Sequence, residues 1–143
     1  MVSDDQGDKL TFIVPDLQQF FSSPAYAVVG ASANRDKFGN KVLRCYQQDN
    51  MHVYPVNPHE EIIEGLATVK TVAELPRSVK SISIVTPPSV TEQIVMQAIQ
   101  HGIQNIWMQP GAESDEAVRN CKQHNLNVIA DGRCILIELN FHE

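Results

Sequence analysis

The residues best suited to chemistry in this sequence stand between positions 25 and 39, in the stretch AYAVVGASANRDKFG. An apolar run ends at Gly30, which can adopt backbone angles that a Cβ would forbid. Ala31 and Ser32 are small, so their backbone N–H groups can face a ligand, and Ser32 adds a hydroxyl donor. Between Gly30 and Arg44 there is one acid, Asp36, and four cations, Arg35, Lys37, Lys41 and Arg44. A basic cluster beside a glycine turn predicts that the turn binds phosphate.

A turn of this kind needs a buried strand before it and a helix after it. The run 25–29 has the composition of a central parallel strand covered on both faces. Further strands are predicted where apolar runs are stopped by turn residues, at 52–56, 81–85, 103–108 and 127–130. Helices are predicted from about Asn40 to Gln48, from Ser89 to Gly102 and from about Ser114 to Gln123. Ser89 is the expected N-cap of its helix, completed by Glu92 as a capping box.

Strands that alternate with helices predict βαβ units with right-handed crossovers. We therefore expect an α/β, Rossmann-like fold, a doubly wound parallel five-stranded sheet with helices on both faces. Ligands of such sheets lie outside the carboxyl ends of the strands, near the point where the strand order reverses. The loops that should share this edge are 30–32, 57–58, 86–88, 109–111 and 131–133. The acidic segment 59–65 is expected to be irregular, and 134–139 to be helical or extended.

The composition limits the class of protein. With 143 residues and 43% hydrophobic residues, we expect a polar tail at 1–11 and one globular domain at 12–143. No apolar run is long enough for a membrane span and the first residues do not resemble a secretory signal, which favours the cytoplasm. The net charge of −6 argues against nucleic acid as a partner. The three cysteines have no metal-ligand spacing and are odd in number, which argues against a zinc site and a disulfide framework.

A dinucleotide site would require a G-x-G-x-x-G turn and an acid at the end of the second strand. This sequence reads G-A-S-A-N after the first strand, so the middle glycine is missing. The residue at the end of the second strand is the neutral Asn57. A neutral amide with cations nearby suits a ribose that carries a 3′-phosphate better than it suits a free diol.

Five motifs occur in a fixed order: GASANRDKFG, YPVNP at 54–58, VTPPS at 85–89, WMQPGAES at 107–114 and DGRCI at 131–135. Together they resemble the stand-alone coenzyme A-binding domain family, whose relatives include the N-terminal domain of the succinyl-CoA synthetase alpha subunit. The resemblance covers roughly residues 12–139. It implies a domain that holds the CoA phosphates at the first turn and the adenosine end near the second and third strand ends. The binding residues that it implies are Gly30, Ala31, Ser32, Asn34, Arg35, Lys37, Asn57, Pro58, Thr86, Pro87 and Pro88.

We expect a small cytosolic protein that binds CoA or acyl-CoA and has no evident catalytic machinery. The active histidine of the synthetase lies in a later domain, so its chemistry is not implied here. Two alternatives stay open: an NAD(P)-binding oxidoreductase-like protein, and an acyl transferase that uses Cys134. Cys134 stands beside the cationic Arg133, a setting found near reactive cysteines, although free cysteine is commonly a buried small hydrophobe. Phe141 and its apolar neighbours are compatible with a homodimer or a partner protein.

Overall fold

The computed structural model describes residues 14–143, so the predicted tail at 1–11 and the first two residues of the predicted domain lie outside the described residues. Five parallel strands form the main sheet in the order β2-β1-β5-β6-β7. They span Ala25–Val29 (β1), Val53–Val56 (β2), Val79–Ile84 (β5), Asn105–Met108 (β6) and Asn127–Ile129 (β7). The predicted doubly wound parallel sheet is confirmed.

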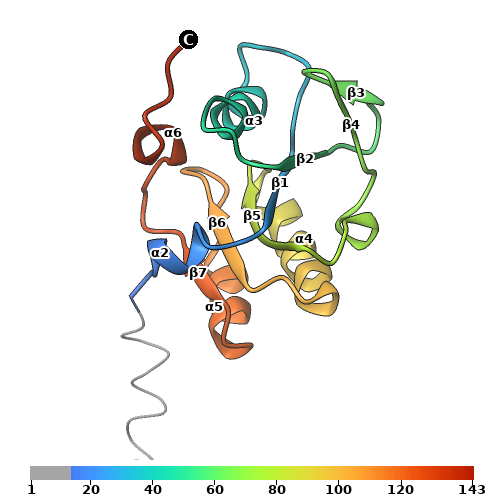
Figure 1. The fold of residues 1–143 in the computed structure, drawn as a ribbon. Coiled ribbons are helices and arrows are strands. Elements are labelled where there is room, and N and C mark those ends of the chain that lie inside the picture. The colour runs from blue at the N-terminus through green and yellow to red at the C-terminus, as the bar shows by residue number, and fades with distance from the viewer. Residues whose placement is uncertain (1–13) are drawn as a thin grey trace, which may run out of the picture.

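Helices connect the strands and cover both faces of the sheet (Figure 1). They span Leu17–Phe20 (α2), Phe38–Gln48 (α3), Pro88–His101 (α4), Asp115–Gln123 (α5) and Ile135–Glu138 (α6), with a short 3₁₀ turn at Val72–Glu74 (η1). The chain runs outward from β1 to β2 and then returns to β5 on the other side of β1. The strand order therefore reverses between β1 and β5, where a ligand crevice is expected.

Strand β1 lies inside the sheet, between β2 and β5, and both of its faces are buried. Ala25, Ala27 and Val29 contribute to the core under α4 and α5, while Tyr26 and Val28 contribute to the core under α2, α3 and α6. This alternation follows from the period of two in a strand, in which successive side chains point to opposite faces. A strand that is covered on both sides is usually rich in apolar residues, and β1 is apolar at every position.

Two predicted helix starts are wrong. Helix α3 begins at Phe38 and not at about Asn40, and helix α4 begins at Pro88 and not after Ser89. Proline at the first helical position has a preset φ and no N–H that needs an acceptor. Pro88 therefore begins the helix at a position that was expected to belong to the loop after the strand. Ser89 therefore lies within the first turn and caps nothing.

The acidic segment expected to be irregular contains a small antiparallel hairpin. Its strands are β3 (Ile62–Ile63) and β4 (Leu66–Ala67). Ile63 is fully buried in the core that contains Tyr46 of α3, which fixes the hairpin beside this helix. Figure 1 shows the hairpin beside the end of β2, at the edge of the sheet. Along the described residues, no helix is both long and apolar enough to cross a membrane.

Candidate functional site

The turn after β1 is shaped by a glycine that no other residue could replace without movement. Gly30 has φ +93°, and a Cβ at this position would lie 2.2 Å from the carbonyl oxygen of Val85. The turn therefore packs directly on the backbone at the end of β5. Its N–H donates to the carbonyl of Val56, and the N–H of Val85 donates to the carbonyl of Val29. Three adjacent strands thus end at the same level, around this glycine.

Residues 31–37 lead from the turn into α3. The Oγ of Ser32 accepts from the N–H of Asn34, and the Oδ1 of Asn34 accepts from the N–H of Asp36. These two short-range bonds define the path of the loop. Lys37 is the N-cap residue of α3, and no side chain caps the helix there. The positive end of the α3 dipole therefore faces outward without a side-chain acceptor.

A hollow of about 500 Å³ lies above this turn. Its lining combines the turn, the start of α3 and the loop after β2, and consists of Gly30, Ala31, Ser32, Asp36, Lys37, Phe38, Gly39, Asn57 and Val85. Lys37 forms no ion pair with any residue in the described part of the chain. The hollow thus offers backbone donors, a hydroxyl and a free cation, which is the chemistry that phosphate oxygens require.

A second hollow of about 310 Å³ lies on the other side of Val85, at the ends of β5 and β6. It is lined by Val85, Thr86, Pro87, Gln109, Pro110, Gly111 and Ala112. Thr86 is fixed by its hydroxyl, which lies 2.8 Å from the hydroxyl of Thr91. Because Val85 borders both hollows, the two hollows are adjacent.

Gln109 connects the second hollow to Cys134. Its Nε2 donates to the Sγ of Cys134 over 3.2 Å, and its Oε1 accepts from the N–H of Ile135 over 2.8 Å. Gln109 is buried, whereas Cys134 is partly exposed at the N-cap of α6. Burial, together with the charges of Asp49 and Cys134, raises the pKa of the Cys45 thiol to about 12. Of these two thiols, Cys134 is the one beside a ligand-sized space.

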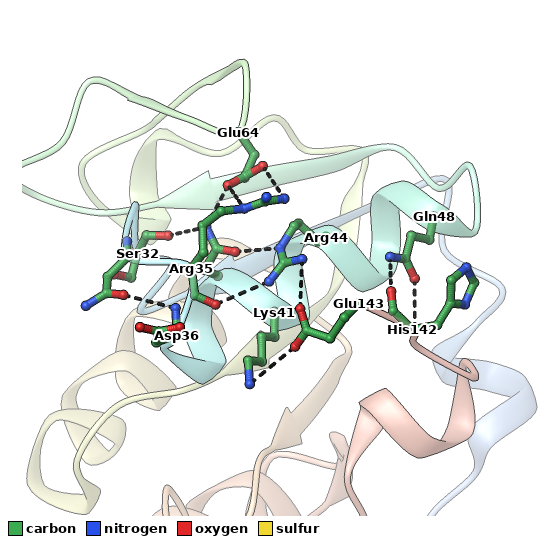
Figure 2. Close-up of polar contacts among 11 residues, drawn as sticks. Ser32, Arg35, Asp36, Lys41, Arg44, Gln48, Glu64, His142 and Glu143 are labelled. Carbon is green, nitrogen blue, oxygen red and sulfur yellow. Dashed lines mark hydrogen bonds and ion pairs between the residues drawn. The ribbon is translucent and has the colours of Figure 1, made fainter.

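The basic cluster predicted around the turn is largely neutralised. Glu64 Oε2 lies 3.2 Å from Nε of Arg35, and Glu143 lies 3.4 Å from both Lys41 Nζ and Arg44 Nη1 (Figure 2). Both acids come from segments remote in the sequence, so the count of neighbouring charges overestimated the positive charge. Arg35 points toward the hairpin residue Glu64 and is not among the residues that line the first hollow.

Asn57 lies at the expected place, but its amide is used within the protein. Nδ2 donates to the carbonyl of Ala31 over 2.8 Å, and Oδ1 accepts from the N–H groups of His59 and Glu60. The side chain thereby holds the loop after β2 against the loop after β1. It forms a wall of the first hollow through this bridge. The residue that directly follows β2 is thus the neutral Asn57, whereas an NAD site has an acid at this end of the strand.

The structure brings together most of the predicted binding residues. Those that line a hollow are Gly30, Ala31, Ser32, Lys37, Asn57, Thr86 and Pro87, whereas Asn34, Arg35, Pro58 and Pro88 line neither of the two. The lining residues that were not among the predicted binding residues are Val85, Asp36, Phe38, Gly39 and those at 109–112, although 109–111 belong to a loop that was predicted to share this edge. All of them lie within the five motifs, so counting every residue of each motif as a candidate would have included them.

Both hollows lie at the ends of the strands, near the point where the strand order reverses, which is where ligands of such sheets bind. Residues 24–140 match the family described as CoA binding domain. This chain belongs to the CoA-binding domain family. The predicted recognition is therefore confirmed, and the matched range contains both hollows and all the predicted binding residues.

Several proteins are similar to this CoA-binding domain. The alpha subunit of acetate–CoA ligase (ADP-forming) II from Pyrococcus furiosus is 32% identical over 91 residues, which are 63% of this chain and 20% of that protein. A conserved hypothetical protein of known structure from the same organism is 40% identical, with a TM-score of 0.76 over 80% of this chain and 97% of that one. A dinucleotide-forming acetyl-coenzyme A synthetase 1 from Ca. Korarchaeum cryptofilum, in complex with phosphate and ADP, is 26% identical, with a TM-score of 0.72 over 82% of this chain and 27% of that one. The chain spans about a fifth of the length of the curated relatives.

Proposed function

We propose that this protein binds CoA or acyl-CoA with the diphosphate above the turn Gly30–Ser32. The observation that carries the proposal is the first hollow, which combines a glycine turn, the start of α3 and the cation Lys37. Within residues 14–143, no side chain caps this helix and Lys37 forms no ion pair. An anion in this position is stabilised by backbone N–H groups and by the helix dipole together. Membership of the CoA-binding domain family supports the choice of CoA among diphosphate ligands.

The two hollows border the same residue, Val85, and offer separate places for the two ends of CoA. In this proposal the adenosine end lies near the loop after β2, which contains Asn57 and Pro58. Residues 86–88 after β5 lie between the adenosine end and the pantetheine arm, because Thr86 and Pro87 line the second hollow. Asn34 contributes by shaping residues 32–37, which we call the phosphate loop. Arg35 contributes once its side chain leaves Glu64. The pantetheine arm runs past Val85 into the second hollow, beside Gln109. The neutral Asn57 favours CoA over NAD, because an NAD site usually places an acid on the ribose hydroxyls there.

We further propose that the protein acts in the cytoplasm as a binding module, without catalytic machinery of its own. Among the described residues that line the two hollows, Asp36 and Lys37 are the ones with ionisable side chains. A partner protein is proposed as the place where bound CoA is used, because similar proteins include an alpha subunit of an acetate–CoA ligase. Association of the chain with itself is the other arrangement that we propose to test.

A second candidate function is acyl transfer through Cys134. The observation that favours it is the contact of 3.2 Å between Gln109 Nε2 and Cys134 Sγ, because Gln109 also lines the second hollow. An amide donor can stabilise a developing thiolate, and a thiolate is the reactive form of cysteine. In that reaction the Cys134 sulfur attacks the thioester carbonyl, the bond to the CoA sulfur breaks, and free CoA leaves with the proton of the Cys134 thiol.

The binding proposal is tested by calorimetric titration with CoA, acetyl-CoA, NAD⁺ and NADP⁺. We expect CoA or acetyl-CoA to bind and to raise the melting temperature, since a ligand of the folded state stabilises it by mass action. Replacement of Lys37 by Ala should weaken CoA binding about tenfold, the effect of one hydrogen bond to a charged group. Lys70→Ala is the matched control, because Lys70 is exposed and lines neither hollow. Binding of NAD(P) alone, or of none of the four, would contradict the proposal.

The acyl-transfer candidate needs its own measurement. Incubation with acetyl-CoA followed by mass spectrometry should show an added acetyl group on Cys134 if the reaction occurs. The Cys134→Ser variant should then lose the modification, while Cys121→Ser, which changes a buried thiol on α5, should keep it. An unmodified protein that still binds acetyl-CoA would reject this candidate and leave the binding proposal intact.

A further inference from the structure

Residues 141–143 lie along the outer side of α3 and are held there by specific contacts (Figure 2). Gln48, the last residue of α3, pairs with the backbone of His142 in both directions. Its Nε2 donates to the carbonyl of His142 over 2.6 Å, and its Oε1 accepts from the N–H over 3.3 Å. A side-chain amide that matches both backbone groups fixes the position of the segment along the helix. We call residues 141–143 the tail segment.

The other two residues of the tail segment contact cations of α3. The Phe141 ring lies under the guanidinium group of Arg44, 5.3 Å from its centre. Glu143 reaches Lys41 and Arg44, each over 3.4 Å. Although desolvation opposes it, the hydrogen bonds and charges of Lys41 and Arg44 lower the pKa of the Glu143 carboxyl. Arg44 is thus engaged by the tail segment on one side through a ring and through a carboxylate.

The same Arg44 holds the phosphate loop on its other side. Its Nη2 donates to the carbonyl of Arg35 over 3.2 Å, and its Nε donates to Oδ1 of Asn40 over 2.7 Å. Asn40 in turn donates from Nδ2 to the carbonyl of Ser32 over 2.9 Å. Arg44 is only 8% exposed and Asn40 is fully buried, so these bonds are sheltered from water. Both ends of the loop 32–35 are therefore anchored, directly or through Asn40, to this one guanidinium group.

We infer that Arg44 is a positioning residue that couples the tail segment to the phosphate loop, so that docking of the tail segment strengthens ligand binding at the turn. The guanidinium group of Arg44 is planar, and its N–H donors point in fixed directions. Contacts with the tail segment therefore fix the orientation of this plane, and the same orientation is needed for the hydrogen bonds to Asn40 and to the Arg35 carbonyl. A loop held in its bound shape before the ligand arrives loses less conformational entropy on binding. By linkage, a ligand at the turn must then strengthen docking of the tail segment by the same factor.

That the loop receives the diphosphate of CoA rests on the function proposed above, whereas the coupling between the tail segment and the loop does not. The two ideas are therefore tested by different measurements. The ligand-free protein is used for the coupling, with amide hydrogen exchange as the readout. Exchange reports local opening of a backbone segment, which is the quantity that the coupling predicts.

The first experiment replaces Gln48 by Ala, which removes the two contacts with the His142 backbone and touches nothing in the phosphate loop. We expect amides of residues 32–37 to exchange at least threefold faster in this variant. Glu138→Gln is the control, because Glu138 is exposed on α6 and forms no ion pair with any described residue. Unchanged exchange in the loop of Gln48→Ala, with faster exchange in the tail segment, would overturn the inference.

The second experiment measures CoA affinity and the reciprocal effect. Gln48→Ala and Glu143→Gln should each bind CoA about threefold to tenfold more weakly than Glu138→Gln, and CoA should slow exchange of the tail segment in the unmodified protein. Arg44→Lys, which keeps the charge and loses the fork, should separate the two sites. In that variant CoA should no longer protect the tail segment. Protection that persists in Arg44→Lys would overturn the role of Arg44, and absence of CoA binding in the unmodified protein would reject the proposed function alone.

Discussion

Gly39 and Gly30 meet backbone to backbone: a Cβ on Gly39 would lie 2.0 Å from the carbonyl oxygen of Gly30 and 3.3 Å from the Cα of Ala31. The first turn of α3 is therefore pressed against the turn that it follows. This contact determines how closely the start of the helix approaches the first hollow, since both glycines line it. The close approach of the helix to the turn therefore depends on a glycine inside α3.

Replacement of Gly39 by Ala should destabilise the protein, against the rule for helices. Helix propensity alone predicts that Ala stabilises a helical position by about 1 kcal/mol relative to Gly. The contact of 2.0 Å is with backbone, which can only give by moving the turn, at a cost of about 1–3 kcal/mol. Urea unfolding gives the sign. Gly111→Ala is a useful comparison, because Gly111 has φ +96° and open space around it, so that variant reports backbone strain alone. A Gly39→Ala protein that is more stable than the unmodified protein would contradict this prediction, because it would show that the Gly30 turn can move away from the added Cβ at little cost.

Tyr46 and Ser83 form a buried hydrogen bond between α3 and β5. Their oxygens are 2.7 Å apart and neither residue is exposed. Replacement of Ser83 by Ala leaves the Tyr46 hydroxyl buried without its partner, which should cost about 1–3 kcal/mol of unfolding free energy. Adding Tyr46→Phe removes the unpaired hydroxyl and should recover part of that loss. Chemical denaturation of the two single variants and the double variant provides the cycle. A double variant less stable than Ser83→Ala would contradict this account.

The sheet and its winding could be predicted because the relevant signals are local. The run 25–29 is apolar at every position, and this pattern requires cover on both faces of the strand. Turn residues after each strand then marked the edge at which the site forms. Gly30, Ala31 and Ser32, which line the first hollow, were predicted from an equally local pattern. Small residues in a turn between a buried strand and a helix leave the backbone N–H groups accessible to a ligand.

The parts that the sequence did not reveal depend on distant partners. Arg35 was predicted to face the ligand, but Glu64 draws it to the hairpin, and these residues are 29 positions apart. Arg44 meets Glu143 over a separation of 99 positions. No count of neighbouring charges can detect such pairs, because the fold decides which acid reaches which cation. The hairpin itself was missed because its strands contain only two residues each, too few for a periodic pattern.

Replacement of Glu64 by Gln should increase the affinity for CoA. The carboxylate holds Arg35 away from the first hollow, and Gln keeps an acceptor for the Nδ2 of Asn40 while it removes the charge. The Arg35 side chain is 63% exposed, so the pair is a weak one and the expected gain is about twofold to fivefold. Calorimetric titration at low salt measures it. Glu61→Gln is the control, since Glu61 is an exposed acid before the same hairpin and forms no ion pair within the described chain. Equal gains in both variants would indicate a general effect of charge.

The three cysteines should differ in reactivity, and CoA should change the reactivity of one of them. Burial raises the pKa of Cys121 to about 12, and burial with nearby charges does the same for Cys45, so both stay protonated and shielded near neutral pH. Cys134 is partly exposed, and iodoacetamide at pH 8 should modify it first. Because Gln109 contacts Cys134 and lines the second hollow, bound CoA should slow this reaction severalfold.

Peptide mass spectrometry over a time course distinguishes the three sites, and the unfolded protein should react at all of them. Adenosine 3′,5′-diphosphate is the informative control ligand, because it lacks the pantetheine arm. It should leave the alkylation rate of Cys134 unchanged while it still competes with CoA for the first hollow. Protection by this shorter ligand as strong as that by CoA would show that the effect reaches Cys134 through the protein, and would argue against a pantetheine arm in the second hollow.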